Sequence, residues 1–66
     1  LALKEALGRL APRLRQVVLL RFVQDKTQTE VAAAMELSQA QVCRLEKQAL
    51  YELRTLLAEV SVKDVG

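Results

Sequence analysis

The chain has 66 residues, a net charge of +2, one cysteine and no histidine. This composition excludes an internal disulfide, a zinc site of the finger type and catalysis by histidine-based triads. Leucine, valine and alanine dominate a hydrophobic fraction of 52%, whereas the chain has only two glycines and one proline. We therefore expect a small all-α domain without a catalytic site, a metal or a cofactor.

Neither a membrane span nor a targeting segment is predicted. The longest apolar run, residues 31–35, is far too short to cross a bilayer. The first ten residues carry Lys4, Glu5 and Arg9 within their apolar pattern and lack the cleavage site of a signal peptide. The chain begins without methionine and within a helical pattern, as a fragment of a longer protein would. We expect a cytoplasmic protein with no membrane partner.

Two helices are predicted in the first third of the chain. Leucine and alanine recur on one face from Leu3 to Leu10, which predicts a short helix over residues 2–7 that Gly8 frays or caps. Pro12 suits the first turn of a second helix, over residues 12–23, because its missing N–H would be unpaired there. The side chains expected to point inward are Leu14, Val17, Val18 and Phe22, with Leu20 nearer the edge, and those expected in solvent are Arg13, Arg15 and Arg21.

A helix-turn-helix is predicted over residues 28–45. An apolar stripe around Val31 indicates a third helix over residues 28–35, and Leu37 then plugs the turn. The stripe resumes at Val42 on a long fourth helix over residues 39–58. The two helices of such a motif cross at about 90–120°, and Ala32 is small enough to let them approach closely. The fold class is all-α: a four-helix domain over residues 1–60, with the fourth helix as recognition helix and a frayed tail over residues 61–66.

Both helices of the motif have explicit start signals. Thr27 with Glu30 fits a capping box, in which each side chain bonds the other residue's backbone N–H, and Ser38 with Gln41 fits a second. Between them, Glu36 occupies a turn position where a positive φ is usual and glycine is the unstrained choice. Two capping boxes around one apolar stripe indicate the helix-turn-helix more strongly than either box alone.

The face of the fourth helix opposite the apolar stripe suits a DNA groove. It carries Ala40, Cys43, Arg44, Lys47, Tyr51 and Arg54. Small residues let the backbone come close to DNA, while cations meet phosphates or guanine edges. Arg44 has no acidic residue one helical turn away, so we predict a DNA contact for it rather than a surface ion pair. The N-terminus of the third helix, with Thr27, Gln28 and Thr29 as donors, is predicted to approach a phosphate.

The segment TQTEVAAAMELSQAQVCRLEKQALYELR resembles the promoter-recognition domain, region 4, of bacterial RNA polymerase sigma factors. The preceding LAPRLRQVVLLRF resembles the first part of that region. Within the family, Thr27-Gln28, Glu30-Val31-Ala32, Ser38-Gln39, Gln41-Val42 and Arg44-Leu45-Glu46 are most like the sporulation and general-stress branch of Gram-positive bacteria. The resemblance covers about residues 3–57.

The resemblance implies sequence-specific binding of the upstream (−35) promoter element by the fourth helix. By position, Gln39, Ala40, Cys43 and Arg44 would face the bases, while Thr27, Gln28 and Lys47 would lie near the DNA backbone. Together with Thr29 and Ser38, these residues form the predicted DNA-binding set. Three positions depart from the family: Glu36 replaces the usual turn glycine, Cys43 stands where serine is common, and Ala40 is too short for a hydrogen bond.

The resemblance also implies docking on the flap of the RNA polymerase β subunit. The apolar residues expected to form this docking surface, because a bundle this small cannot bury them all, are Leu3, Leu7, Leu50, Leu57 and Val60. An anti-sigma factor is a further candidate partner. Two alternatives stay open: a DNA-binding domain of the response-regulator type, and a protein-interaction module held by an anti-sigma factor. A DNA-binding assay at several salt concentrations separates the second, because phosphate contacts make affinity salt-dependent.

Overall fold

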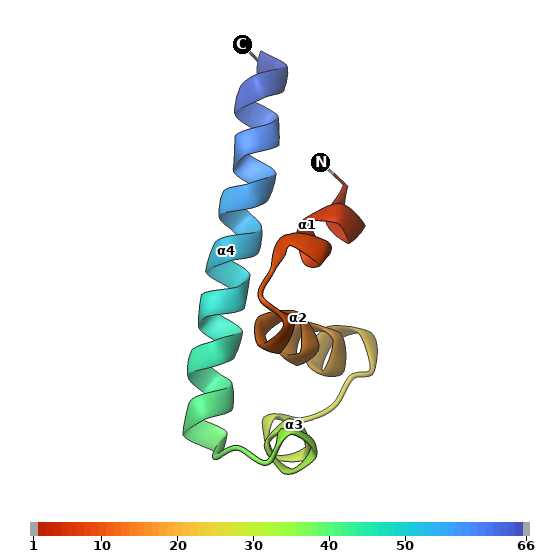
Figure 1. Ribbon diagram of the computed structural model, residues 1–66, viewed down its shortest axis with the longest axis vertical. Coiled ribbons are helices and arrows are strands. Elements are labelled where there is room, and N and C mark those ends of the chain that lie inside the picture. Colours follow the sequence, from red (N-terminus) through yellow and green to blue (C-terminus); the bar gives the residue numbers. More distant parts are fainter. Residues whose placement is uncertain (1, 66) are drawn as a thin grey trace.

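The structure is a computed structural model that describes the backbone of residues 2–65 and the side chains of residues 2–58. Its elements are α1 (Leu3–Arg9), α2 (Pro12–Val18), the π-helical turn η1 (Leu19–Val23), α3 (Gln28–Met35) and α4 (Gln39–Val65). The long α4 forms one side of the molecule, and α1, α2 and α3 are stacked along the other (Figure 1). The predicted all-α fold with four helices is confirmed, and residues 2–65 contain no strand.

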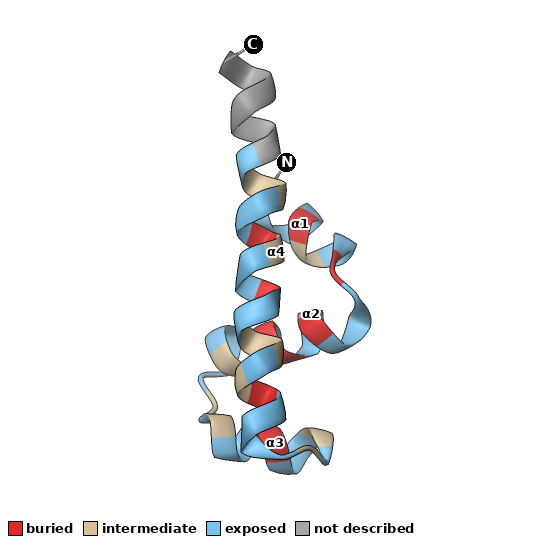
Figure 2. Ribbon diagram, turned by 90° about the vertical axis from the view of Figure 1, so that its left-hand side faces the viewer, coloured by how far each residue is buried: buried red, intermediate tan, exposed pale blue. Residues whose placement is uncertain are grey.

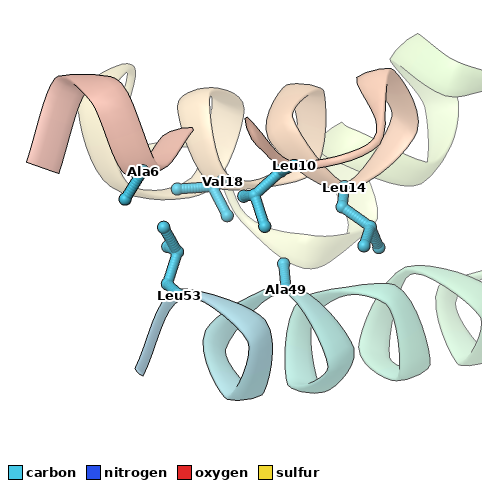
Figure 3. Close-up of a cluster of buried hydrophobic side chains, with 6 residues drawn as sticks. All are labelled: Ala6, Leu10, Leu14, Val18, Ala49 and Leu53. Carbon is cyan, nitrogen blue, oxygen red and sulfur yellow. The ribbon is translucent and has the colours of Figure 1, made fainter. Parts of the chain in front are cut away.

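One core cluster joins the first two helices to the middle of α4. Its buried members are Ala6, Leu10, Leu14, Val18, Ala49 and Leu53. Their side chains point toward one another across the gap between α1–α2 and α4 (Figure 3). Leu7, Leu45, Leu56 and Leu57 are partly buried against this cluster. The cluster therefore holds α1 against α4, well away from the turn between α3 and α4.

A second cluster holds the helix-turn-helix together. Val17, Val31 and Val42 are fully buried, one from each of α2, α3 and α4, and Ala32 lies beside them. Leu37 is partly buried against the same cluster, which confirms its predicted place in the turn. The buried positions lie on the sides of the helices that face one another, while exposed positions cover the outside (Figure 2). The relative placement of α3 and α4 thus rests on small, branched side chains.

The first helix ends two residues later than expected. α1 runs from Leu3 to Arg9 rather than over residues 2–7, so Gly8 lies inside it and does not cap it. The helix ends instead because Leu10 adopts an extended conformation, with φ −71° and ψ 151°, and buries its side chain in the core. The sequence pattern correctly predicted that Leu10 is buried, but the prediction that the helix ends at Gly8 was wrong.

The second helix changes type part-way along. After Val18 the chain forms the π-helical turn η1, where the N–H of Gln24 donates to the carbonyl of Leu19 at 3.0 Å. A π-helical turn holds one more residue than an α-helical turn, so later side chains rotate away from the apolar stripe. Phe22, predicted to point inward, is 53% exposed, and Leu20 packs against the second cluster instead. The prediction of a single α-helix over residues 12–23 was therefore wrong.

The last helix is longer than predicted. It begins at Gln39 as expected but continues to Val65 instead of ending near residue 58, and the backbone over residues 61–65 is helical where a frayed tail was expected. No glycine or proline interrupts the sequence between Ser38 and Gly66, so nothing local stops the helix. The side chains of residues 59–66 lie outside the described residues, and the boundary of the domain at residue 60 stays a prediction.

The turn of the helix-turn-helix has the predicted strained residue. Glu36 lies in the left-handed region, with φ 57° and ψ 43°. The N–H of Leu37 donates to the carbonyl of Ala32 at 2.9 Å, and the N–H of Glu36 donates to Ala33 at 3.4 Å. These two bonds form the Schellman motif that commonly ends a helix, usually with glycine at the position of Glu36. A second residue with positive φ, Asp25 (56°), precedes α3 and was not predicted.

Glu36→Gly is expected to raise the free energy of unfolding by about 0.5–1 kcal/mol, because relief of left-handed strain outweighs the added freedom of the unfolded chain. Thermal unfolding followed by circular dichroism measures the change. Glu36→Ala is the control, since it removes the same charge but keeps a Cβ in the strained position. A glycine variant less stable than the alanine variant would contradict this account of the turn.

Candidate nucleic-acid interface

The start of α4 presents a continuous exposed surface. Among the residues predicted to bind DNA, Ser38, Gln39, Ala40, Arg44 and Lys47 are exposed and Cys43 is half-buried. Val42, Leu45 and Ala49 point the other way, into the two core clusters. The recognition helix therefore has the two faces that its sequence pattern predicted, with small residues and cations together on the open one.

The first residues of α4 are held by the predicted capping box. The N–H of Gln41 donates to Ser38 Oγ at 3.1 Å, and the N–H of Ser38 donates to Gln41 Oε1 at 2.9 Å. These bonds satisfy backbone donors that a helix start otherwise leaves to water. The end of α4 that carries Gln39 and Ala40 is thus ordered before any ligand arrives.

The start of α3 is capped in the same way. The N–H of Glu30 donates to Thr27 Oγ1 at 3.1 Å, and the N–H of Thr27 donates to Glu30 Oε1 at 2.9 Å. Mainly through the Thr27 backbone N–H, these contacts lower the pKa of Glu30 from its ordinary value of 4.5. The ionised Glu30 side chain therefore stabilises the fold fully at pH values above its ordinary pKa. This stabilisation is lost as the pH falls through the lowered pKa of the folded state.

Of the three α3 residues predicted to meet a phosphate, two are open to solvent. Thr27 and Thr29 are exposed, whereas Gln28 is half-buried. The side-chain amide of Gln28 donates through Nε2 to Glu46 Oε2 of α4 at 3.1 Å. Gln28 therefore already has an internal partner, which the sequence analysis did not foresee.

Glu46 also forms an ion pair with Arg21, the one ion pair found in the described part of the chain. Its Oε2 lies 3.1 Å from Nε of Arg21, whose side chain is 26% exposed while that of Glu46 is 13% exposed. The guanidinium of Arg21 lies over the ring of Phe22 and donates through Nη1 to the carbonyl of Lys26 at 2.6 Å. Arg21 was expected to be a solvated surface residue, and that prediction was wrong. The sequence contained a partial signal for this pair, since Glu46 lies at the flank of the α4 apolar stripe.

Two other arginines face a common pocket. A shallow pocket of about 220 Å³ is lined by Arg13, Leu37, Gln41, Arg44 and Leu45. Arg13 comes from the first turn of α2 and Arg44 from α4, so the fold brings together cations that are far apart in sequence. Within residues 2–58, Arg13, Arg44 and Lys47 form no ion pair. Arg13 was assigned to a solvated face, and only the tertiary packing reveals its proximity to the recognition helix.

The predicted docking residues do not all behave alike. Leu3 and Leu50 are 57% and 42% exposed, which agrees with the expectation that they lie on the surface. Leu7 and Leu57 instead pack half-buried against the first core cluster. Val60 lies outside the residues whose side chains are described. Leu3 and Leu50 therefore remain the exposed part of the proposed docking surface.

The comparison with family models decides the classification of this domain. The model described as "Sigma-70, region 4" matches residues 6–55, which run from the middle of α1 to the middle of α4. The chain belongs to the sigma-70 region 4 family.

Named relatives of this region 4 domain are sigma factors of RNA polymerase. The chain is 48% identical over 54 residues to the RNA polymerase sigma-F factor of Priestia megaterium, covering 82% of this chain and 21% of the relative. It is 51% identical over 53 residues to the sigma-G factor of Bacillus subtilis (strain 168), covering 80% and 20%. The chain thus spans about a fifth of the length of these relatives. No solved structure matches it.

The region 4 match confirms the family predicted from the sequence. The sigma-F and sigma-G relatives agree with the predicted sporulation and general-stress branch. The match favours a sigma-factor domain over the response-regulator alternative. Within the described residues of this region 4 domain, no helix is both long and apolar enough to cross a membrane.

Ser38→Ala is expected to lower the free energy of unfolding of the region 4 domain by about 1 kcal/mol, because the first turn of α4 loses its cap. It should also weaken DNA binding, since the end of α4 that frays carries Gln39 and Ala40. Thermal unfolding and DNA titration of the same samples measure both effects. Ser38→Asp is the control, because aspartate also caps helices well. Unchanged stability of Ser38→Ala would show that the capping box contributes little.

Proposed function

We propose that this region 4 domain binds the upstream (−35) promoter element in the major groove through the start of α4, as part of a sigma factor that directs RNA polymerase to promoters. The single observation that carries the proposal is the exposed, capped first half of α4, where small residues stand beside cations that have no acidic partner within residues 2–58. Such a helix can approach base edges closely and still meet phosphates. A protein with this role acts in the cytoplasm, where promoter DNA lies.

In this proposal the bases are read by four residues. Arg44 donates to guanine or to a phosphate, Gln39 reaches an adenine edge, and Ala40 and Cys43 offer small contacts such as a thymine methyl group. Because Ala40 has no hydrogen-bonding group, the base opposite it is selected by shape and apolar contact. The half-buried Cys43 sits beside Arg44 on the same face. Ser38 places this set by capping the helix.

The DNA backbone is held from both sides of the motif. Thr27, Gln28 and Thr29 lie at the start of α3, where unpaired backbone N–H groups favour an anion, and Lys47 lies further along α4. Arg13 adds a cation from α2 at the rim of the shared pocket. Backbone contacts from two helices fix the orientation of the motif, while the bases select the sequence.

Binding by this domain alone is expected to be weak. The net charge is only +2, and a single module of this size buries about 600–1,000 Å² on DNA. Attachment to polymerase raises the effective concentration and strengthens binding by factors of about 10²–10⁴ without new DNA contacts. The proposed activity therefore belongs to the assembled sigma factor, and the domain supplies the sequence preference.

A salt titration tests the DNA-binding proposal. Fluorescence anisotropy measures the affinity of the chain for a duplex carrying a −35 element of sigma-F or sigma-G type and for a scrambled duplex, at several salt concentrations from 20 mM upward. The expected result is tighter binding to the first duplex, and affinity that falls with salt by a log–log slope of about −0.9 per phosphate contacted. Absence of a salt-dependent slope would instead favour a module that only binds protein, such as an anti-sigma factor.

We further propose that the apolar surface at the far end of the domain docks on the β flap of RNA polymerase. Its exposed members are Leu3 and Leu50, and its half-buried members are Leu7 and Leu57. Val60 completes the surface proposed from the sequence. Leu7 and Leu57 pack against the first core cluster, whereas Leu37, which lines the pocket with Arg44, packs against the second. The two partners would therefore bind the domain at the same time.

Leu50→Asp is expected to weaken binding of an isolated flap peptide about fivefold, because it loses apolar contact area and brings a charge into the interface. Tyr51→Asp is the matched control: it adds the same charge at the neighbouring, 70% exposed position of α4. Titration of the labelled chain with the peptide measures both variants. Equal loss in the two would assign the effect to charge alone and remove Leu50 from the docking surface.

A further inference from the structure

The carboxylate of Glu46 connects three separate segments of the domain. One oxygen, Oε2, accepts hydrogen bonds from Nε of Arg21 in η1 and from Nε2 of Gln28 in α3, each at 3.1 Å. Glu46 itself belongs to α4, one residue before Lys47. Its side chain is only 13% exposed, so it is largely withdrawn from solvent and from any ligand. A single atom thus links both helices of the helix-turn-helix to the element that precedes them.

Arg21 extends this network to the backbone that leads into α3. Its Nη1 donates to the carbonyl of Lys26 at 2.6 Å, immediately before the capping residue Thr27. The carboxylate of Glu46 and the carbonyl of Lys26 therefore hold the guanidinium from two directions. Through the Arg21 guanidinium, the position of the start of α3 depends on α4 as well as on the apolar contacts of the second core cluster.

The same contact sets the orientation of the Gln28 amide. A glutamine amide carries one acceptor oxygen and a nitrogen with two hydrogens, whereas a phosphate only accepts hydrogen bonds. Because Nε2 donates one hydrogen to Glu46, the amide is held with its nitrogen on the α4 side and one N–H left over. Without Glu46, rotation of the amide would present its oxygen to a phosphate as readily as its nitrogen.

We propose that Glu46 is a positioning residue for DNA binding: it orients Gln28 and the start of α3 relative to the recognition helix without contacting DNA. This inference rests on the proposed function. The negative charge of Glu46 is compatible with a nearby phosphate because Arg21 neutralises it and the surrounding protein covers it. Its effect on DNA binding passes through Gln28.

The first experiment observes the Gln28 amide directly. In ¹H–¹⁵N NMR spectra of the whole chain, the side-chain NH₂ signals of Gln28 are assigned from their absence in Gln28→Ala. With Glu46 present they are expected at shifts unlike those of solvent-exposed glutamines. Glu46→Ala should move them to the exposed range, and Glu46→Gln, which keeps one acceptor but no charge, should move them part-way. Signals unchanged in both variants would overturn the proposal, and they are measured without DNA.

The second experiment measures coupling in DNA binding. Gln28→Ala and Glu46→Ala are each expected to weaken binding to the −35 duplex about fivefold, and the double variant by no more than either alone, as for residues acting through one contact. Losses that multiply would show that Glu46 acts independently of Gln28. If Gln28→Ala binds the −35 duplex as tightly as the wild type, the proposal is also overturned, because no DNA contact would then depend on Glu46.

Glu52→Ala is the matched control. Glu52 lies on α4 and accepts a hydrogen bond from a glutamine, Gln48 Nε2, at 3.1 Å, but the contact stays within the helix and is exposed. The substitution changes the net charge by the same amount as Glu46→Ala and should leave the Gln28 signals in place. If wild-type chain binds neither duplex, the proposed function fails, whereas the NMR result still decides whether Glu46 orients Gln28. Equal effects of the two glutamate variants would reduce the role of Glu46 to net charge.

Discussion

Arg44→Ala is expected to weaken binding to a cognate −35 duplex by about 1–3 kcal/mol and to relax the preference at one base pair. Arg44 is exposed on the open face of α4, lines the pocket next to the turn, and has no acidic partner within residues 2–58. Its guanidinium is therefore available to a ligand without breaking an internal ion pair. Anisotropy titrations with duplexes substituted at each position of the element measure both the loss and the change in preference.

Two further variants define the role of Arg44. Arg44→Lys keeps the charge but loses the planar pair of donors that recognises guanine, so most of the base preference should be lost while part of the affinity remains. Arg9→Ala removes an equal charge from the last turn of α1, on the part of the fold that adjoins the first core cluster, and should change affinity little. If Arg44→Ala weakens binding to cognate and random duplexes equally, Arg44 contacts a phosphate and not a base.

The recognition of the helix-turn-helix from sequence succeeded because its determinants are local. Both capping boxes, the start of α4 and the left-handed Glu36 depend on residues within one or two turns of one another. Periodicity also placed Val42 and Ala49 correctly on the buried face of α4. Where neighbouring residues determine the structure, the pattern of a single sequence was sufficient.

The errors that bear on the candidate site concern features that depend on packing between distant segments. The π-helical turn that exposes Phe22 accompanies contacts of Arg21 with Glu46 and Lys26, and none of these is encoded in the apolar pattern of residues 12–23. Likewise, Arg13 reaches the pocket beside Arg44 only through the packing of α2 on α4. Arginine side chains on a helix surface look alike in sequence, and their partners distinguish them only after folding.

The angle between α3 and α4 is expected to depend on Ala32. This residue is 7% exposed and packs with Val17, Val31 and Val42, where the helices of the motif meet. Its carbonyl also accepts the hydrogen bond from Leu37 that closes the turn. The short side chain at this position lets α3 lie close to α4, as the sequence predicted.

Ala32→Leu should therefore lower the free energy of unfolding by about 1–3 kcal/mol, because a well-packed site must expand to accept the larger side chain. Ala34→Leu is the matched control: Ala34 is exposed on the same helix, and surface substitutions usually change stability by less than about 0.5 kcal/mol. Thermal unfolding of both variants gives the comparison. Equal stability of the two would show that the helices have room to spare at Ala32.

The same substitution has a second expected consequence, on DNA binding. Displacement of α3 from α4 moves Thr27 and Thr29 relative to Arg44, so the phosphate and base contacts no longer fit one duplex together. Measured at a temperature where circular dichroism shows Ala32→Leu fully folded, its affinity for the cognate duplex should fall while that of Leu14→Ala, which loses core packing away from the motif, stays close to wild type. If the two folded variants lose DNA affinity equally, Ala32 does not control the angle between α3 and α4.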